Sequence, residues 1–220
     1  MQIKSLRKAT RRGSNLVEFA LVVYVLLPLM FGTVNLGFNL SRAVQVSQVV
    51  RDIGHLYVRN LDFSLSASTN LAVRLTSGLG MTANGGDGVL ILSRIQYITD
   101  TQCTAGGVAV GSCTNNNKAV VTQRYVLGNS SLRSSAFATP ATNIVLAADD
   151  ANSGYKKGEI LPANYLTNST AATSGFTSVL TGMTGGETAY LVEGYFKSTG
   201  WNFSQSYSPN TDGVYARVIF

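Results

Sequence analysis

One acidic side chain, Glu18, lies inside an apolar run of the sequence, "RRGSNLVEFALVVYVLLPLMFG" at residues 11–32. A carboxylate placed in hydrocarbon costs several kcal/mol, so acidic residues in such runs usually have a function and a partner. The sequence therefore raises the question of which group neutralises Glu18.

Other residues with catalytic or metal-binding potential are few. His55 is the only histidine, so Ser-His-Asp or metal-histidine chemistry would have to use it, and we interpret it as a surface or packing residue. The stretch at 149–159 contains four side chains that could hold calcium: Asp149, Asp150, Asn152 and Glu159. Tyr155 stands where an EF-hand loop has its turn glycine. We expect no enzyme activity, no cofactor and no metal site.

The apolar run is long enough to cross a membrane once. No charged residue occurs in the 22 positions from Phe19 to Leu40, and about 20 helical residues span the hydrocarbon core. A cleaved secretory signal is the competing interpretation, but its apolar segment is shorter, roughly 7 to 15 residues, and ends at a small-x-small site. We predict one transmembrane helix over about residues 17–40.

The basic residues indicate the orientation of this helix. Five of them precede it: Lys4, Arg7, Lys8, Arg11 and Arg12. Only Arg42 and Arg51 follow closely, so the positive-inside rule places the N-terminus in the cytoplasm and the chain after about Ser41 outside, in the periplasm or extracellular space. We therefore predict a single-pass protein of the inner (cytoplasmic) membrane.

The same basic residues account for the formal charge of +6. Without these five, 12 basic residues stand against 11 acidic ones, so the rest of the chain is nearly neutral. A clustered basic groove for phosphates has little support, and we expect no nucleic acid partner.

The chain contains two cysteines, Cys103 and Cys113, in the part predicted to lie outside. In an oxidising compartment such a pair is most simply a disulfide that closes a short loop. Two free buried thiols are the alternative if the topology is inverted.

The remaining pattern predicts an α+β fold. Apolar residues at three- and four-residue steps continue the first helix beyond the membrane to about Leu61, although Pro28 interrupts the good helix formers. If unbroken from Leu16, this helix would be roughly 70 Å long. We therefore divide the chain into residues 1–13, a helix at 14–61 that is amphipathic after residue 40, and an outer domain at 62–220.

The outer domain should combine one short helix with a small antiparallel sheet. Leucines at four-residue spacing predict a helix at 66–79, with hydroxyl residues available as its N-cap. The runs "VLILSRIQYIT" and "KAVVTQRYVLG" flank the cysteine loop and predict a hairpin, and "TAYLVEGYFKS" and "GVYARVIF" predict two further strands. Residues 129–187, rich in Ser, Thr, Asn, Ala and Gly, should form long surface loops.

The N-terminal features form one pattern: a basic segment, Gly13, Ser14, three residues, Glu18, Phe19 and an apolar helix. This pattern resembles the cleavage site of type IV prepilins. The longer run "RRGSNLVEFALVVYVLLPLMFGTVNLGFNLSRAVQVSQVVRDIGHLYV" is similar to the TadE-like proteins of the tight-adherence (Flp) pilus system. In that family a "G-S/N-x-x-VEFAL" start leads to a proline in the apolar helix, an "FG" pair and a "small-Arg" continuation.

The resemblance implies that a prepilin peptidase cuts between Gly13 and Ser14. The new amine would lie four residues before Glu18, on the same helix face, and could neutralise it within one subunit or between neighbours. Glu18 and Phe19 would then belong to the assembly region. The other interpretation is that Glu18 reaches the inner headgroups from an uncleaved helix.

The resemblance also implies a function. The protein would be a membrane-anchored pseudopilin or minor pilin that takes part in pilus assembly, adhesion and surface display. Its partners would be the prepilin peptidase, the major pilin, other minor pilins and the pilus platform proteins of the inner membrane. The rival is an uncleaved bitopic envelope protein whose outer domain binds a ligand or a surface.

Overall fold

The structure is a computed structural model that describes residues 7–173, 183–197 and 213–220, with side chains in the first helix described from Asn15 onward. The chain divides into two compact units, and the division falls inside the first helix, between Arg42 and Ala43. The N-terminal part of that helix belongs to one unit, and the sheet and its surroundings belong to the other. Each unit is described separately.

The first helix, α1, spans Arg7–Val58 without interruption. It therefore begins inside the predicted leader, before the expected start at residue 14, because the leader contains no proline or helix stop. Pro28 lies in its interior and cannot donate a backbone hydrogen bond to the preceding turn. Its 18-residue window of highest hydropathy averages 2.1 and is not buried at all, which makes α1 long and apolar enough to cross a membrane.

The end of α1 lies three residues before the predicted end at Leu61. Asn60 adopts a left-handed conformation with φ of 61°, and its N–H donates to the Tyr57 carbonyl at 2.9 Å. The Leu61 N–H donates to the Leu56 carbonyl at 3.1 Å. These two bonds form a Schellman motif, which satisfies the last carbonyls of the helix and stops it.

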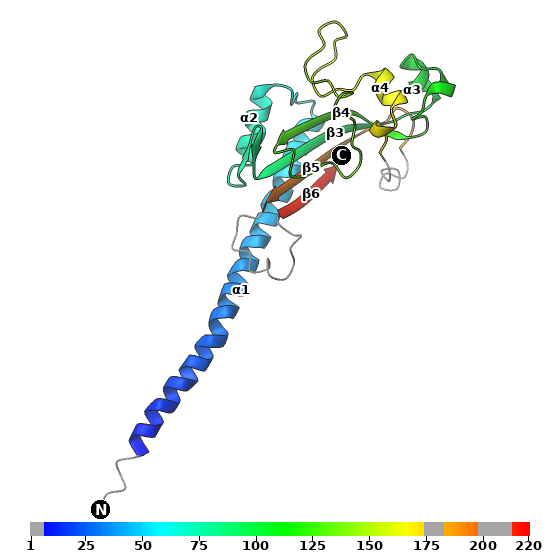
Figure 1. Cartoon of the computed structure of the whole chain (residues 1–220). Coiled ribbons are helices and arrows are strands. Elements are labelled where there is room, and N and C mark those ends of the chain that lie inside the picture. The colour runs from blue at the N-terminus through cyan, green and yellow to red at the C-terminus, as the bar shows by residue number, and fades with distance from the viewer. Residues whose placement is uncertain (1–6, 174–182, 198–212) are drawn as a thin grey trace, which may run out of the picture. The chain divides into compact units, whose positions relative to one another are not determined.

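The second unit is built around a four-stranded antiparallel sheet, which confirms the α+β prediction (Figure 1). Its strands are β3 (Gly88–Tyr97), β4 (Ala119–Gly128), β5 (Thr188–Lys197) and β6 (Gly213–Ile219), in the order β4-β3-β5-β6. The predicted hairpin is confirmed as the β3–β4 pair, and the two predicted C-terminal strands are confirmed as β5 and β6. Two backbone hydrogen bonds of 2.9 Å with Tyr190 hold the last residue, Phe220.

One face of the sheet packs against the C-terminal part of α1. The helix buries Val46, Val50, Ile53 and Tyr57 against strand residues that include Leu90, Leu92, Val192 and Phe196. Gly194 on β5 permits the close approach, because a Cβ there would lie 2.5 Å from Cγ2 of Val50. Burial of this amphipathic face, more than intrinsic helix propensity, stabilises the end of α1.

The other face of the sheet is covered by the segment after β4. The prediction of surface loops for residues 129–187 is wrong for much of the described part, since Phe137, Ile144 and Ile160 form a second core with Leu191. This segment also contains α4 (Pro162–Thr167) and a 3-10 turn, η2 (Ser169–Ala171). Its apolar residues, including the short run at 144–148, follow neither a helical nor a strand period, so no periodic pattern revealed their burial.

The remaining elements are short. Helix α2 covers Ser66–Leu75, shorter than the predicted 66–79, and its N-cap is Leu65 without a side-chain bond, so the hydroxyl N-cap prediction is wrong. A tiny hairpin, β1 (Met81–Thr82) with β2 (Gly85–Gly86), leads into β3. Between β3 and β4 lie α3 (Asp100–Ala105) and the 3-10 turn η1 (Val110–Ser112).

Candidate processing and assembly site

Glu18 lies on the surface of α1, one turn after Ser14. Residues 15–20 of the helix are all exposed, Glu18 among them. The ion pairs between described side chains do not include Glu18. Gly13 and Ser14 lie in the helical backbone, but the side chain of Ser14 is outside the described residues. Because the whole segment is helical, Ser14 and Glu18 occupy one face at i, i+4 spacing.

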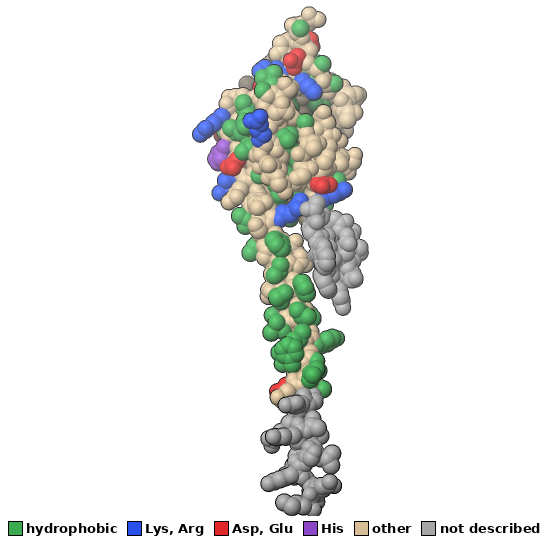
Figure 2. Space-filling model, turned by 90° about the vertical axis from the view of Figure 1, so that its left-hand side faces the viewer, with side chains coloured by type: hydrophobic (Ala, Val, Ile, Leu, Met, Phe, Trp, Pro, Cys, Tyr) green, Lys and Arg blue, Asp and Glu red, His purple; other side chains and the backbone are tan. Residues whose placement is uncertain are grey.

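The helix beyond Glu18 exposes apolar side chains around its surface. Phe19 is 69% exposed, Tyr24 78% and Phe38 72%. Figure 2 shows hydrophobic side chains along the visible side of this helical segment. An aqueous surface rarely tolerates a continuous apolar area of this kind, so the segment needs a membrane or other helices around it.

Two glycines leave open space on the same part of the helix. A Cβ added at Gly32 or Gly37 would meet no atom within 4 Å. The hydroxyl of nearby Thr33 donates a hydrogen bond to the Met30 carbonyl at 2.8 Å, so it needs no partner outside the helix. Small residues on an exposed helix surface permit close contact with another helix.

The C-terminal end of α1 is joined to the sheet edge by a chain of polar contacts. Tyr57 Oη donates to Gln123 Oε1 at 3.0 Å, and Gln123 Nε2 donates to Tyr125 Oη at 2.8 Å. Tyr125 Oη donates to Asp62 Oδ1 at 3.3 Å, and Lys156 Nζ lies 2.9 Å from Asp62 Oδ2. This network connects the helix end, the loop after it and β4.

The surroundings shift the pKa of two members of this network, Tyr57 and Asp62. Burial raises the pKa of Tyr57 well above its usual value. Burial also raises the pKa of Asp62, but hydrogen bonds from Ser64 and Lys156 outweigh this effect and lower the pKa to about 2. Asp62 is therefore ionised across the physiological range, and the contact with Lys156 is a charge pair.

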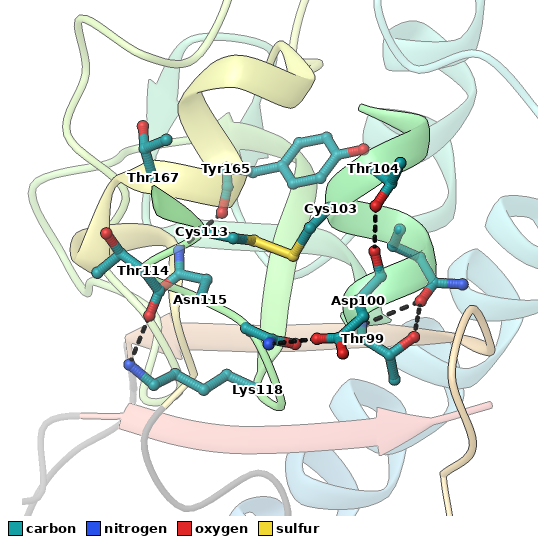
Figure 3. Close-up of a disulfide and its surroundings, with 12 residues drawn as sticks. Thr99, Asp100, Cys103, Thr104, Cys113, Thr114, Asn115, Lys118, Tyr165 and Thr167 are labelled. Atoms are coloured by element: carbon teal, nitrogen blue, oxygen red, sulfur yellow. Dashed lines mark hydrogen bonds between the residues drawn. A yellow bond between two sulfur atoms is a disulfide. The ribbon is translucent and has the colours of Figure 1, made fainter. Parts of the chain in front are cut away.

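Cys103 and Cys113 form a disulfide in the structure (Figure 3). Both are buried, and they pack with Ile98, Val120 and Leu166, so the bond lies between α3 and α4. Asn115 strengthens the same junction, since its Nδ2 donates to the Tyr165 carbonyl at 2.7 Å and to the Asn168 carbonyl at 2.8 Å. The bond therefore holds the β3–β4 connection against the segment that covers the sheet.

The acidic stretch at 149–159 forms a hydrogen-bonded turn. Asp150 Oδ1 accepts the N–H groups of Asn152 and Ser153 at 3.1 and 3.4 Å. Asp149 accepts the N–H of Lys157 at 2.7 Å, while Glu159 Oε1 lies 3.4 Å from Arg94. No three His, Cys, Asp or Glu side chains among the described residues gather as metal ligands.

His55 packs against the end of the chain. Its ring centroid lies 4.9 Å from that of Phe220. A Cβ at the adjacent Gly54 would lie 2.2 Å from Cε2 of Phe220, so the glycine makes room for the ring. His55 therefore contributes a packing contact, in agreement with the sequence interpretation.

Sequence reasoning missed a buried carboxylate, Glu193 on β5. Its side chain is 2% exposed and accepts hydrogen bonds from Ser135 Oγ, from the Ala136 N–H at 3.1 Å and from Tyr215 Oη at 2.7 Å. The only signal was an acidic residue in the apolar run "YLVEGYF", and its three donors come from distant segments.

Comparison with known protein families gives one match. Residues 13–54 match the family described as TadE-like protein, which confirms the resemblance over the helix that carries Glu18. No curated protein and no solved structure matches the chain. The match associates the chain with the tight-adherence pilus system. Among the described residues, one helix is long and apolar enough for membrane anchoring.

Proposed function

We propose that this protein is a membrane-anchored pseudopilin or minor pilin of a tight-adherence pilus, with roles in pilus assembly, adhesion and surface display. The single observation that carries the proposal is the exposed, charge-free helix surface that begins directly after Glu18, within the TadE-like match. A helix of this kind can lie in the membrane before assembly and among other pilin helices afterwards. The function would be packing and display, without catalysis.

The processing site would be the peptide bond between Gly13 and Ser14. A prepilin peptidase at the cytoplasmic face would remove residues 1–13 and leave an amine on Ser14. Since Ser14 and Glu18 share a helix face, this amine could pair with Glu18 in the same chain or in an adjacent subunit. In a low-dielectric setting an unpaired charge is strongly penalised, so the pairing would favour one register between neighbouring helices.

The charge pattern and the disulfide support one topology. The basic leader favours a cytoplasmic N-terminus in the inner membrane. Disulfides persist in oxidising compartments, which agrees with a periplasmic or extracellular position for Cys103 and Cys113. The boundaries proposed for the regions remain residues 1–13, 14–61 and 62–220.

The partners follow from this arrangement. The open helix surface around Gly32 and Gly37, together with Phe19, would contact the helices of the major pilin and of other minor pilins. The pilus platform proteins of the inner membrane would receive the anchored helix before assembly.

The intact mass of the protein extracted from membranes tests the proposal. We expect the mature species without residues 1–13 in the wild type, and the full-length species in Gly13→Leu, because a bulky side chain should block the peptidase. Ala9→Leu, a matched change in the leader, should leave processing intact. A wild-type protein that keeps its full mass would instead support the uncleaved bitopic envelope protein.

A further inference from the structure

The outer domain contains a cavity of about 480 Å³ along the outer edge of β4. Its walls come from β4, from the segment at 130–147, from residues 63–69 before and within α2, and from the turn at 157–158. A volume of this size lies in the range of small-molecule sites, roughly 300 to 1,000 Å³. The cavity lies wholly within the second unit.

The lining of the cavity is cationic. It includes Arg124, Arg133 and Lys157, and none of the described residues that line it is acidic. The buried carboxylate near Arg124 is Glu193, which already accepts hydrogen bonds from Ser135, the Ala136 N–H and Tyr215. The cavity therefore presents an excess of positive charge to a ligand.

Arg124 supplies an unused bidentate donor. The side chain is 9% exposed, and its Nη1 donates to the Ala138 carbonyl at 2.7 Å. Its Nε and Nη2, which form one edge of the guanidinium, are buried without a partner. Two parallel N–H donors of this kind match the two oxygens of a carboxylate or phosphate. Burial lowers the pKa of Arg124 to about 10, so the group is still a cation at neutral pH.

The backbone of β4 adds a further donor. The N–H groups of Arg124 and Gly128 point away from β3, toward the carbonyls of Gly158 and Ala83, at 2.8 and 3.1 Å. Val126 lies midway between them, so its N–H points to the same side of the strand. Val126 lines the cavity, and no described backbone carbonyl accepts its N–H.

Hydroxyl side chains complete the wall. Ser130, Ser134, Thr139 and Thr142 line the cavity and are exposed. Hydroxyls can donate to and accept from the hydroxyls of a sugar, whereas the arginine fork would bind its acidic group. We propose that this cavity binds an acidic sugar, a hydroxylated ring that carries a carboxylate or a phosphate. The two unpaired nitrogens are shielded from solvent, so the lining of the cavity must rearrange for the ligand to reach them.

Calorimetric titration of the full-length protein in detergent micelles tests the proposal. The probes are glucuronate, glucose 6-phosphate, uncharged glucose and inorganic phosphate. We expect at least one sugar acid to bind at least about tenfold more tightly than glucose and inorganic phosphate, since both the acidic group and the ring make contacts. Tighter binding of glucuronate would identify the preferred anionic group as a carboxylate, and tighter binding of glucose 6-phosphate would identify it as a phosphate.

Variants locate the binding in the cavity. Arg124→Lys keeps the charge but loses the fork and should weaken binding at least about tenfold. The double variant Arg133→Met with Lys157→Met changes two exposed lining residues, so it decides the question if Arg124→Lys does not fold. Arg59→Met, an exposed arginine outside the cavity, is the matched control and should bind normally. Binding of inorganic phosphate as tight as that of the sugar acids, absence of binding by both acids, or full binding by the cavity variants would overturn the proposal.

Discussion

Replacement of both cysteines by alanine should destabilise the domain around the four-stranded sheet by a calculable amount. Cys103 and Cys113 are 10 residues apart in the sequence. For a loop of this length the chain-entropy model gives a stabilisation of about 2.7 kcal/mol at 25 °C, because the cross-link restricts the unfolded chain. The double variant should lose most of that free energy of unfolding.

The native fold should nevertheless survive in the double variant. The β3–β4 ladder and the two hydrogen bonds of Asn115 to the Tyr165 and Asn168 carbonyls remain. Alanine is small and apolar, and both cysteines are buried, so the substitution introduces no unpaired polar group. The cost should therefore appear as lower stability and not as a different structure.

Hydrogen exchange on the full-length protein in detergent micelles measures this loss. The Ile98 amide donates to the Lys118 carbonyl at 2.9 Å, at the base of the cysteine loop. If it exchanges through unfolding of the domain, 2.7 kcal/mol corresponds to about a hundredfold lower protection. Reductant should produce the same change in the wild type and none in the double variant, while Ser112→Ala, an exposed change inside the loop, should behave as the wild type.

Two results would refute this reasoning. Equal protection in the oxidised wild type and the double variant would mean that the cross-link does not stabilise the domain. Thiol labelling of both cysteines in the unreduced, denatured protein would mean that the bond is not formed in the cell, and it would also count against an outer location of this domain.

The remaining predictions concern the helix and its junction with the sheet. Glu18→Gln should insert and be cleaved normally but lose pilus assembly in a cellular assay, because the Ser14 amine would lack its counter-ion; normal pili would favour an uncleaved anchor. Gly194→Val should destabilise the domain in denaturant titrations by about 1–3 kcal/mol, because its Cβ would overlap Val50, whereas Gly111→Val, with open space around it, should have little effect. Asp62→Asn should be less stable than the wild type at pH 7, and the difference should shrink as the pH falls and disappear below about pH 2. The lowered pKa of Asp62 gives stability that is present above the usual carboxyl pKa and is lost as the pH falls through about 2, so a difference in stability that does not change with pH would contradict the assignment.

The sequence alone determined the features that depend on neighbouring residues. The charge-free run after Glu18 specified an exposed apolar helix, since a span of that length follows from composition. Runs rich in Val, Ile and Tyr on both sides of Cys103 and Cys113 indicated the hairpin, because strands that follow one another in sequence usually pair. The pattern at Gly13, Ser14 and Glu18 led to the family whose match covers residues 13–54.

The tertiary structure decided what depends on residues far apart in the chain. The order β4-β3-β5-β6 brings Glu193 on β5 beside donors from Ser135 and Tyr215. The sequence patterns of β5 and β6 do not reveal which residues lie beside Glu193. Apolar residues such as Phe137, which follow no helical or strand period, became a core only when their segment folded over the sheet. Long-range packing also left one edge of the Arg124 guanidinium without a partner, and the candidate ligand site follows from that arrangement in space.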